Sequence, residues 1–277
     1  MNLNDEPVCE GGFLASPKLL EWRPGADVPI LSADEVWAWI VDLDAGLDSG
    51  EDAETTEPGP ELAILAADEQ ARAARFVRAR DRRRFVRCRA ALREILGRLL
   101  DEPASSLRFR TATVGKPELD GESDENHHAL RFNVSHSSEL GLIAVCRGRE
   151  VGVDLERVRS ITEAGRIVAS FFSASELAEF NAILEEDKAL AFHRGWTRKE
   201  AVLKGSGMGL AGLASHLETG FGTTGLTPRF TPARPSSRVD RWMLWEAAPR
   251  PGFVAALVVD VGQPEASGSL PAPPGTP

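Results

Sequence analysis

The sequence predicts an α+β protein of two similar lobes that face each other, each with a helix packed on a small antiparallel sheet. With 277 residues, of which 42% are hydrophobic and 27% charged, it has the composition of a soluble globular protein large enough for two small domains. Both halves, 35–147 and 148–262, contain a strand, a substantial helix and later hairpin strands in that order. We expect a ligand to bind between the lobes.

The ends of the chain and the cysteines indicate a cytoplasmic protein. The N-terminus lacks the basic and apolar segments of a signal peptide, and the longest apolar run, Phe253 to Val259, is too short to cross a bilayer. Three widely spaced cysteines suggest reduced thiols without a zinc pattern, with Cys88 and Cys146 as small core residues. Residues 1–34 are expected to be an extension and 263–277 a flexible tail.

Charge is distributed unevenly along the chain. The net charge is −10, yet residues 72–98 contain eleven arginines against Asp81 and Glu94, so this window carries +9 and the remainder −19. The acidic remainder argues against nucleic-acid binding, because it would repel a phosphate backbone. We expect most of these arginines to lie on a solvated helix face, and one or two near Arg72 to Arg75 to contact a small polyanion or an acidic protein.

The first lobe begins with a strand at residues 35–43, which are rich in aromatic and β-branched residues. An acidic stretch with Gly, Pro and Thr at 44–61 is typical of a mobile loop, and helices are expected over 62–76 and 81–100. A short strand at 106–110 and a hairpin of 132–136 with 140–147 complete this lobe. Ser135 and His136 do not form a nucleophile and base, because neighbours on a strand point to opposite faces.

The second lobe begins with Val151-Gly-Val-Asp-Leu-Glu-Arg-Val158. Alternation places Val151, Val153 and Leu155 in a core and Asp154 and Glu156 on the other face. Two carboxylates at positions i and i+2 of a strand lie about 6.5 to 7 Å apart, which allows both to reach one hard cation.

The remaining elements of the second lobe follow from capping and periodicity. A helix over 171–184 is expected to start at Ser173, with Glu176 at the capping-box position, and another helix spans 189–204. Residues 219–240 are predicted to form a loop or irregular strand, and 241–246 and 252–261 the closing strands.

The helix over 189–204 carries a carboxylate and an ammonium one turn apart. Trp196, Glu200, Leu203 and Lys204 share one face, and glycines after Lys204 are expected to end the helix. Such a pair is usually a weak surface contact. The flanking Trp and Leu indicate a buried face instead, where a carboxylate needs a strong partner.

These motifs together resemble the 4'-phosphopantetheinyl transferases, and the larger, two-lobed surfactin-synthetase-activating type in particular. The resemblance covers about residues 36–260 and rests on five motifs in the same order: the runs Arg75-Phe and Asp81-Arg-Arg-Arg-Phe, then Gly115-Lys-Pro, Phe132-Asn-Val-Ser-His, Val151-Gly-Val-Asp-Leu-Glu with Phe171-Phe-Ser, and Trp196-Thr-Arg-Lys-Glu-Ala-Val-Leu-Lys. It implies two lobes related by pseudo-twofold symmetry.

The resemblance also implies an activity and a site. The enzyme would move the phosphopantetheine arm of coenzyme A to a serine of an apo acyl or peptidyl carrier protein and release adenosine 3',5'-bisphosphate. Asp154, Glu156 and Glu200 would hold Mg²⁺ on the pyrophosphate, Lys204 would contact the same group, and Glu200 is the candidate base. The adenosine end would be held by the set Arg72, Lys116, Ser135 and His136.

Two other functions are compatible with parts of the sequence. A Mg²⁺-dependent hydrolase of coenzyme A or a nucleotide pyrophosphate would use the same acids with water in place of serine. A non-enzymatic binding module built on the arginine-rich helix would leave the three acids unexplained. The protein is expected to be a monomer, because its two lobes supply within one chain the interface that a single-lobe relative makes by oligomerising.

Overall fold

The computed structural model describes residues 16–32, 35–46, 56–111, 116–120, 130–208, 214–222, 229–230 and 242–261. The mixed α+β architecture agrees with the predicted fold class. In the described ranges, none of the helices combines the length and the apolar character needed to cross a membrane.

The first sheet has the strand order β1-β2-β6-β5. Its strands are β1 (Lys18–Glu21), β2 (Val36–Asp42), β5 (Leu130–Ser137) and β6 (Leu140–Arg147). The predicted first strand and the hairpin are confirmed. β1 runs parallel to β2 and was not predicted, because its four residues lie in the segment interpreted as an extension.

Three helical segments cover one face of this sheet. They are the 3₁₀ helix η1 (Pro60–Ile64), α1 (Ala67–Ala73) and α2 (Ala79–Leu100). The helix predicted over 62–76 is therefore broken, and the Glu69 side chain caps the new start by accepting from the Ala66 N–H at 3.0 Å. Apolar residues of α2, among them Leu92 and Ile95, pack on Trp37 and Trp39 of β2.

The second sheet has the order β10-β11-β7, all antiparallel. β7 (Val151–Arg157), β10 (Trp242–Ala247) and β11 (Phe253–Asp260) were all predicted. Helix α6 (Lys188–Ser206) packs on this sheet through Ala201, Val202 and Leu203. It ends before Gly207, whose φ of +66° is the left-handed conformation that commonly follows a helix, as the glycine-rich exit predicted.

Smaller elements surround α6. The helix predicted over 171–184 is divided into α4 (Ala164–Phe171) and α5 (Ala174–Ala182), and Ser173 caps α5 with Glu176 as predicted. β3 (Phe109–Thr111) pairs with β4 (Pro117–Leu119), and η2 (Ala214–His216) leads into β8 (Leu217–Glu218), which pairs with β9 (Arg229–Phe230).

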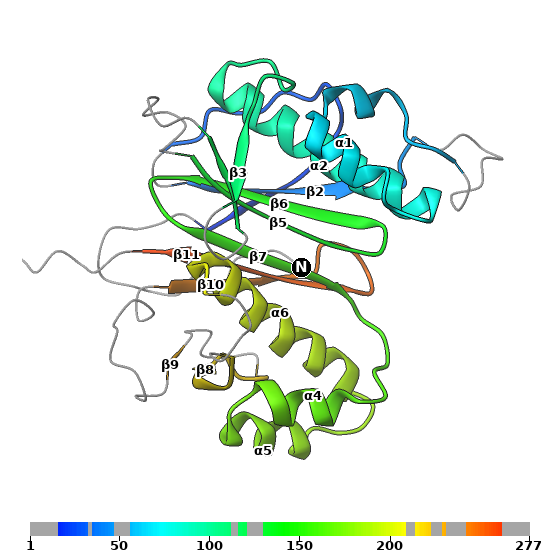
Figure 1. The fold of residues 1–277 in the computed structure, drawn as a ribbon. Helices are drawn as coiled ribbons and strands as arrows, with labels where there is room; N and C mark the ends of the chain where they lie inside the picture. Colours follow the sequence, from blue (N-terminus) through cyan, green and yellow to red (C-terminus); the bar gives the residue numbers. More distant parts are fainter. Residues whose placement is uncertain are drawn as a thin grey trace, which may run out of the picture.

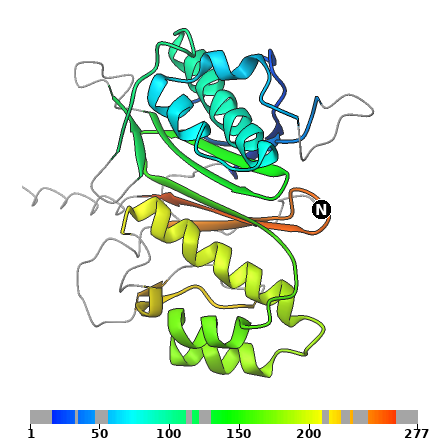
Figure 2. The same ribbon diagram turned by 45° about the vertical axis from the view of Figure 1, so that its right-hand side comes forward.

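The two sheets stack face to face between the helices (Figures 1 and 2). α1 and α2 cover the outer face of the first sheet, and α6 covers the outer face of the second. The inner faces share one core, in which Val36, Ala38 and Ile40 of β2 meet Val153 and Leu155 of β7. Both faces of β2 are thus buried, which explains its nearly continuous apolar sequence. The pseudo-twofold relation between the halves stays a prediction.

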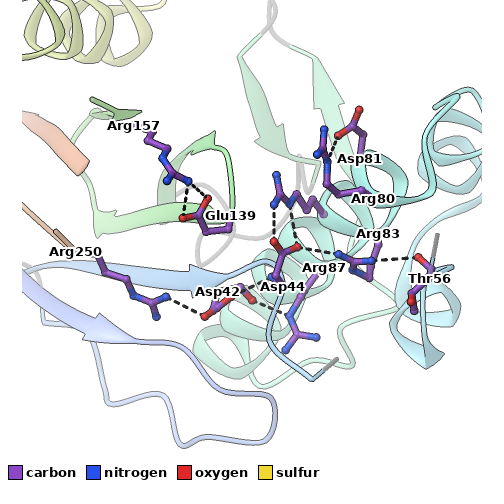
Figure 3. A network of polar contacts seen from close by, with 11 residues as sticks. Asp42, Asp44, Thr56, Arg80, Asp81, Arg83, Arg87, Glu139, Arg157 and Arg250 are labelled. Carbon is purple, nitrogen blue, oxygen red and sulfur yellow. Dashed lines mark hydrogen bonds and ion pairs between the residues drawn. The ribbon is translucent and has the colours of Figure 1, made fainter. Parts of the chain in front are cut away.

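The arginine-rich helix is held by acids of its own chain. Figure 3 shows Asp44 in contact with Arg83 at 2.9 Å, and Asp44 also pairs with Arg84 at 2.5 Å. Arg93 is 1% exposed and binds Glu69 at 2.6 Å. Arg82 and Arg87 pair with Glu57 and Glu61. The interpretation of most of the series as a solvated face is therefore wrong, because Asp44, Glu57, Glu61 and Glu69 pair with arginines of the helix.

The two described buried cysteines, Cys88 and Cys146, are free thiols inside the core, as predicted. Cys9 lies outside the described residues. Burial raises the pKa of the Cys88 thiol to about 11, so it stays protonated and behaves as a small apolar residue.

Candidate active site

The site begins with the close approach of α6 to β7. A Cβ on Gly152 would lie 2.0 Å from the carbonyl oxygen of Ala201 and 2.5 Å from the main-chain nitrogen of Gly205, both in α6. Only a residue without a side chain fits there. Because side chains alternate along a strand, Asp154 and Glu156 share the face of Gly152 and are brought beside the last turns of α6.

Asp154 and Lys204 form the centre of the site. Asp154 is 4% exposed, and its Oδ1 accepts hydrogen bonds from the Lys204 ammonium at 2.6 Å and from the Ser135 hydroxyl at 2.8 Å. Lys204 also donates to Ser135 at 3.1 Å. Burial raises the pKa of Asp154 against the opposing effect of Lys204. The ammonium of α6 therefore neutralises a strand acid, and the contact joins β5, β7 and α6.

Glu156 is the second acid on the same face of β7. Its Oε2 accepts from the Ser137 hydroxyl at 2.9 Å. Burial and then the charge of Asp154 raise its pKa. The negative charge of Asp154 therefore opposes the ionisation of Glu156, two residues further along the same strand.

Glu200 approaches these acids from α6. Burial, followed by the negative charges of Asp154 and Glu156, raises the pKa of Glu200 to about 7, although Lys204 opposes the shift. Its buried Oε1 has no hydrogen-bond partner among the described residues. A carboxylate that is about half ionised near neutral pH and keeps a free oxygen is suited to accept a proton.

His136 and Arg72 lie at the edge of the same site. Desolvation of the imidazole, and then the positive charges of Lys204 and Arg72, lower the pKa of His136, while Asp154 opposes them. Arg72 is exposed and its guanidinium lies 5.2 Å from the centre of the Phe85 ring. Ser135 is buried and His136 exposed, so the two neighbours lie on opposite faces, as expected.

Lys116 is held away from this edge. Its ammonium donates to Glu150 at 2.7 Å and to the carbonyl oxygens of Val151 at 3.0 Å and Gly205 at 3.2 Å. An ammonium has three protons, and these three acceptors engage all of them. In this structure Lys116 therefore fastens the end of α6 to the start of β7, whereas its contact with a ligand stays a prediction.

The contacts of Asp154, Glu156 and Glu200 decide whether these acids fit Mg²⁺. In the described part of the chain, no three His, Cys, Asp or Glu side chains converge into a ready metal site. Asp154 Oδ2 and Glu200 Oε1 are nevertheless buried without a partner among the described residues. Together with Glu156, these carboxylates offer the oxygen ligands that Mg²⁺ prefers. The residues therefore fit Mg²⁺, and Lys204 now neutralises part of their charge.

The two residues before Glu200, Arg198 and Lys199, make their contacts on another side of α6. Arg198 is 1% exposed and binds Glu246 of β10 as well as the carbonyl oxygens of Thr219, Gly220 and Gly222. Lys199 pairs with the buried Glu176 at 2.8 Å. Both cations anchor the 217–222 segment, which fixes the rotation of α6 that directs Glu200 and Lys204 to β7.

Sequence reasoning missed Asn133 and Ser137. Both lie on β5, and their side chains bond to main-chain N–H groups of β7. The available signal was the spacing Asn133-x-Ser135-x-Ser137, which places three hydrogen-bonding side chains on one face of a strand.

Comparisons with known proteins identify what this arrangement is similar to. The sequence profile of the 4'-phosphopantetheinyl transferase superfamily matches residues 150–235, and that of the 4'-phosphopantetheinyl transferase N-terminal region matches residues 58–147.

Curated relatives agree with these profiles. The 4'-phosphopantetheinyl transferase HetI of Nostoc sp. is 34% identical over 240 residues, which cover 86% of this chain and 93% of the relative. The L-aminoadipate-semialdehyde dehydrogenase-phosphopantetheinyl transferase of Homo sapiens is 28% identical over 56% of this chain and 52% of its own. The transferase Sfp of Bacillus subtilis is 25% identical over 54% of this chain and 63% of its own.

Proposed function

Because the chain belongs to the 4'-phosphopantetheinyl transferases, we propose that it moves the 4'-phosphopantetheine arm of coenzyme A to a serine hydroxyl of an acyl or peptidyl carrier protein, releasing adenosine 3',5'-bisphosphate. The observation that carries the proposal is the contact of Lys204 with Asp154 and Ser135, 2.6 and 3.1 Å away, beside two further acids with raised pKa values. This arrangement suits a pyrophosphate that Lys204 would contact directly and that the acids of two elements would contact through a cation.

Each residue has a separate task in the transfer. The serine oxygen forms a bond to the phosphorus of the arm, and the bond from that phosphorus to the bridging pyrophosphate oxygen breaks. Glu200, with its free Oε1 and a pKa of about 7, takes the serine proton. Lys204 stabilises the negative charge on the departing bisphosphate.

Asp154, Glu156 and Glu200 would hold Mg²⁺, which when bound supplies positive charge to the pyrophosphate oxygens. A carboxylate bound to a cation is a weaker base, so the role of Glu200 depends on which of its oxygens is engaged. Arg72 and His136, at the edge of the site, would bind the adenosine end with its 3'-phosphate, and Lys116 and Ser135 would contact the same end. We also propose that the chain divides into lobes at 35–147 and 148–262, with the ligands between them.

The test is direct. The protein is incubated with coenzyme A, Mg²⁺ and an apo acyl or apo peptidyl carrier protein, and the carrier is measured by intact-protein mass. We expect the mass of one phosphopantetheine arm to be added, and Asp154→Ala to abolish the addition while circular dichroism shows a folded protein. Release of the bisphosphate from coenzyme A without a modified carrier would instead identify a hydrolase.

A further inference from the structure

Side chains, not main-chain pairing, connect β5 of the first sheet to β7 of the second. β7 pairs with β11 on one edge, and its other edge faces β5. Three alternate N–H groups on that edge donate to three alternate side chains of β5 at 3.0 to 3.3 Å: Val153 to Asn133, Leu155 to Ser135 and Arg157 to Ser137. We name these three side chains the β5 ladder.

Two members of the β5 ladder also hold the site acids. Ser135 donates to Asp154 at 2.8 Å and Ser137 donates to Glu156 at 2.9 Å. A serine hydroxyl has one proton and two lone pairs. Since a main-chain N–H of β7 already donates to each hydroxyl oxygen, the hydroxyl proton is directed to the carboxylate. Each serine therefore fixes which carboxylate oxygen is engaged.

We infer that Ser137 is a positioning residue for the Glu156 carboxylate, as Ser135 is for Asp154, so that a strand of the first half orients acids carried by the second half. The inference rests on the proposed function, in which these acids hold Mg²⁺. Partners that orient metal-binding side chains typically contribute 10- to 100-fold to metal affinity or activity. Asn133 differs from the two serines in a useful way, because the described contacts of its side chain include the β7 main chain but no site acid.

The experiment compares Ser137→Ala with wild type. Two quantities are measured: the Mg²⁺ concentration for half-maximal transfer, and the Kd of Mg²⁺ for the protein with coenzyme A bound, by calorimetry without a carrier. We expect both to rise by about 10-fold or more. The KM for the carrier should change less than about threefold, because Ser137 acts on the acid.

Two variants serve as controls. Ser137→Thr keeps the hydroxyl and should therefore bind Mg²⁺ with nearly the affinity of the wild type. Asn133→Ala removes one rung of the β5 ladder without removing an acid contact, so it should lower Tm and leave the Mg²⁺ constants unchanged. If Ser137→Ala proves unfolded, Ser137→Cys, which has a similar size but a weak donor, replaces it.

The outcomes separate the two proposals. A Ser137→Ala protein with wild-type Mg²⁺ constants overturns the positioning role, and so does an Asn133→Ala protein that loses Mg²⁺ affinity equally, because the effect would then be a general loosening. If the wild type does not modify a carrier but calorimetry still shows the Ser137 effect, the transferase proposal fails while the positioning role stands.

Discussion

Lys204 shows how a single charge can serve both the resting protein and the reaction. Its ammonium neutralises the buried Asp154, yet 31% of its side chain is exposed and so open to a ligand. We expect Lys204→Met to lower kcat by about 100-fold or more with a smaller change in the KM for coenzyme A, because the charge matters most as the leaving group departs. Steady-state kinetics measure the two effects separately.

Lys188→Met is the matched control for this variant. Lys188 lies at the start of the same helix, where it pairs with the exposed Glu185, so its loss should leave kcat unchanged. A Lys204→Met enzyme with a normal kcat and a raised KM would show that the ammonium binds the ground state instead.

Arg72 is expected to distinguish coenzyme A from its dephospho form. The guanidinium is exposed beside His136, and charge-assisted hydrogen bonds from arginine to phosphate are short and strong. The ratio of kcat/KM for the two donors should therefore shrink in Arg72→Ala. Arg78→Ala removes the same charge from an exposed position nearby and should keep the ratio. Equal ratios in wild type and Arg72→Ala would place Arg72 outside the site.

The sequence predicted several residues of the site but not their hydrogen-bond partners. Alternation in β7 and helical spacing in α6 identified Asp154, Glu156, Glu200 and Lys204, because both are local rules. The partner of Lys204 was not predictable, since its i, i+4 relation to Glu200 describes one helix and the actual bond crosses to β7. The three acceptors of Lys116 likewise come from distant parts of the chain.

At the scale of elements, the contact between α6 and β7 depends on Gly152. We expect Gly152→Ala to lower the free energy of unfolding by about 3 kcal/mol, because a methyl group 2.0 Å from a main-chain oxygen forces the helix away. We also expect the transfer activity of the folded variant to fall, because α6 carries Glu200 and Lys204. Thermal unfolding together with transfer assays at a temperature where the variant is folded measure both.

Gly165→Ala is the control for this substitution. Gly165 lies in α4 with open space where a Cβ would be built, so alanine should be neutral or slightly stabilising there. A Gly152→Ala protein as stable and active as Gly165→Ala would show that α6 can shift without loss.

Glu246 of β10 makes the anchorage of α6 dependent on pH. Burial alone would raise its pKa, but hydrogen bonds from Arg194 and Arg198 outweigh it and hold the pKa below the ordinary value. The contribution to stability is therefore present above about pH 4.3 and is lost as the pH falls through the lowered folded-state pKa.

We expect Glu246→Gln to reduce the free energy of unfolding at pH 7 by about 3 kcal/mol. The difference from wild type should narrow as the pH falls below about 4. Urea unfolding at several pH values measures this, with Glu163→Gln at an exposed ion pair as the control. A gap between Glu246→Gln and wild type that stays constant down to pH 2 would contradict the assignment.

Elements were predicted well where their signal is local. β2 is rich in aromatic and β-branched residues, a polar turn separates β5 from β6, β7 alternates, and α6 carries its own helical stripe. β1 has four residues and gains its order by pairing with β2, so its sequence alone carries little signal. The break in the helix predicted over 62–76 depends on the Glu69 side chain, which also binds Arg89 and Arg93 some twenty residues later.

The whole molecule is expected to be a monomer of 30.0 kDa. The inner faces of both sheets are buried against each other within one chain, so the apolar surface that a single lobe would expose is already covered. Light scattering of active enzyme checks this. An obligate dimer whose site combines residues of two chains would contradict it.

From the sequence we could predict two lobes that face each other, but not how their sheets stack. Its details depend on long-range ion pairs, such as Arg250, which joins the β10–β11 turn to Asp42 of β2 at 2.9 Å (Figure 3). No periodicity within either segment indicates such a partner.

The β5 ladder makes the contact between β5 and β7 sensitive to substitution. A main-chain pairing between strands tolerates almost any substitution, because the backbone is the same whatever the side chain. At this junction each bond to the β7 main chain depends on one side chain, that of Asn133, Ser135 or Ser137. A single substitution at one of these three positions would therefore remove one specific bond between the halves without removing the others, while the apolar core that the halves share stays in place.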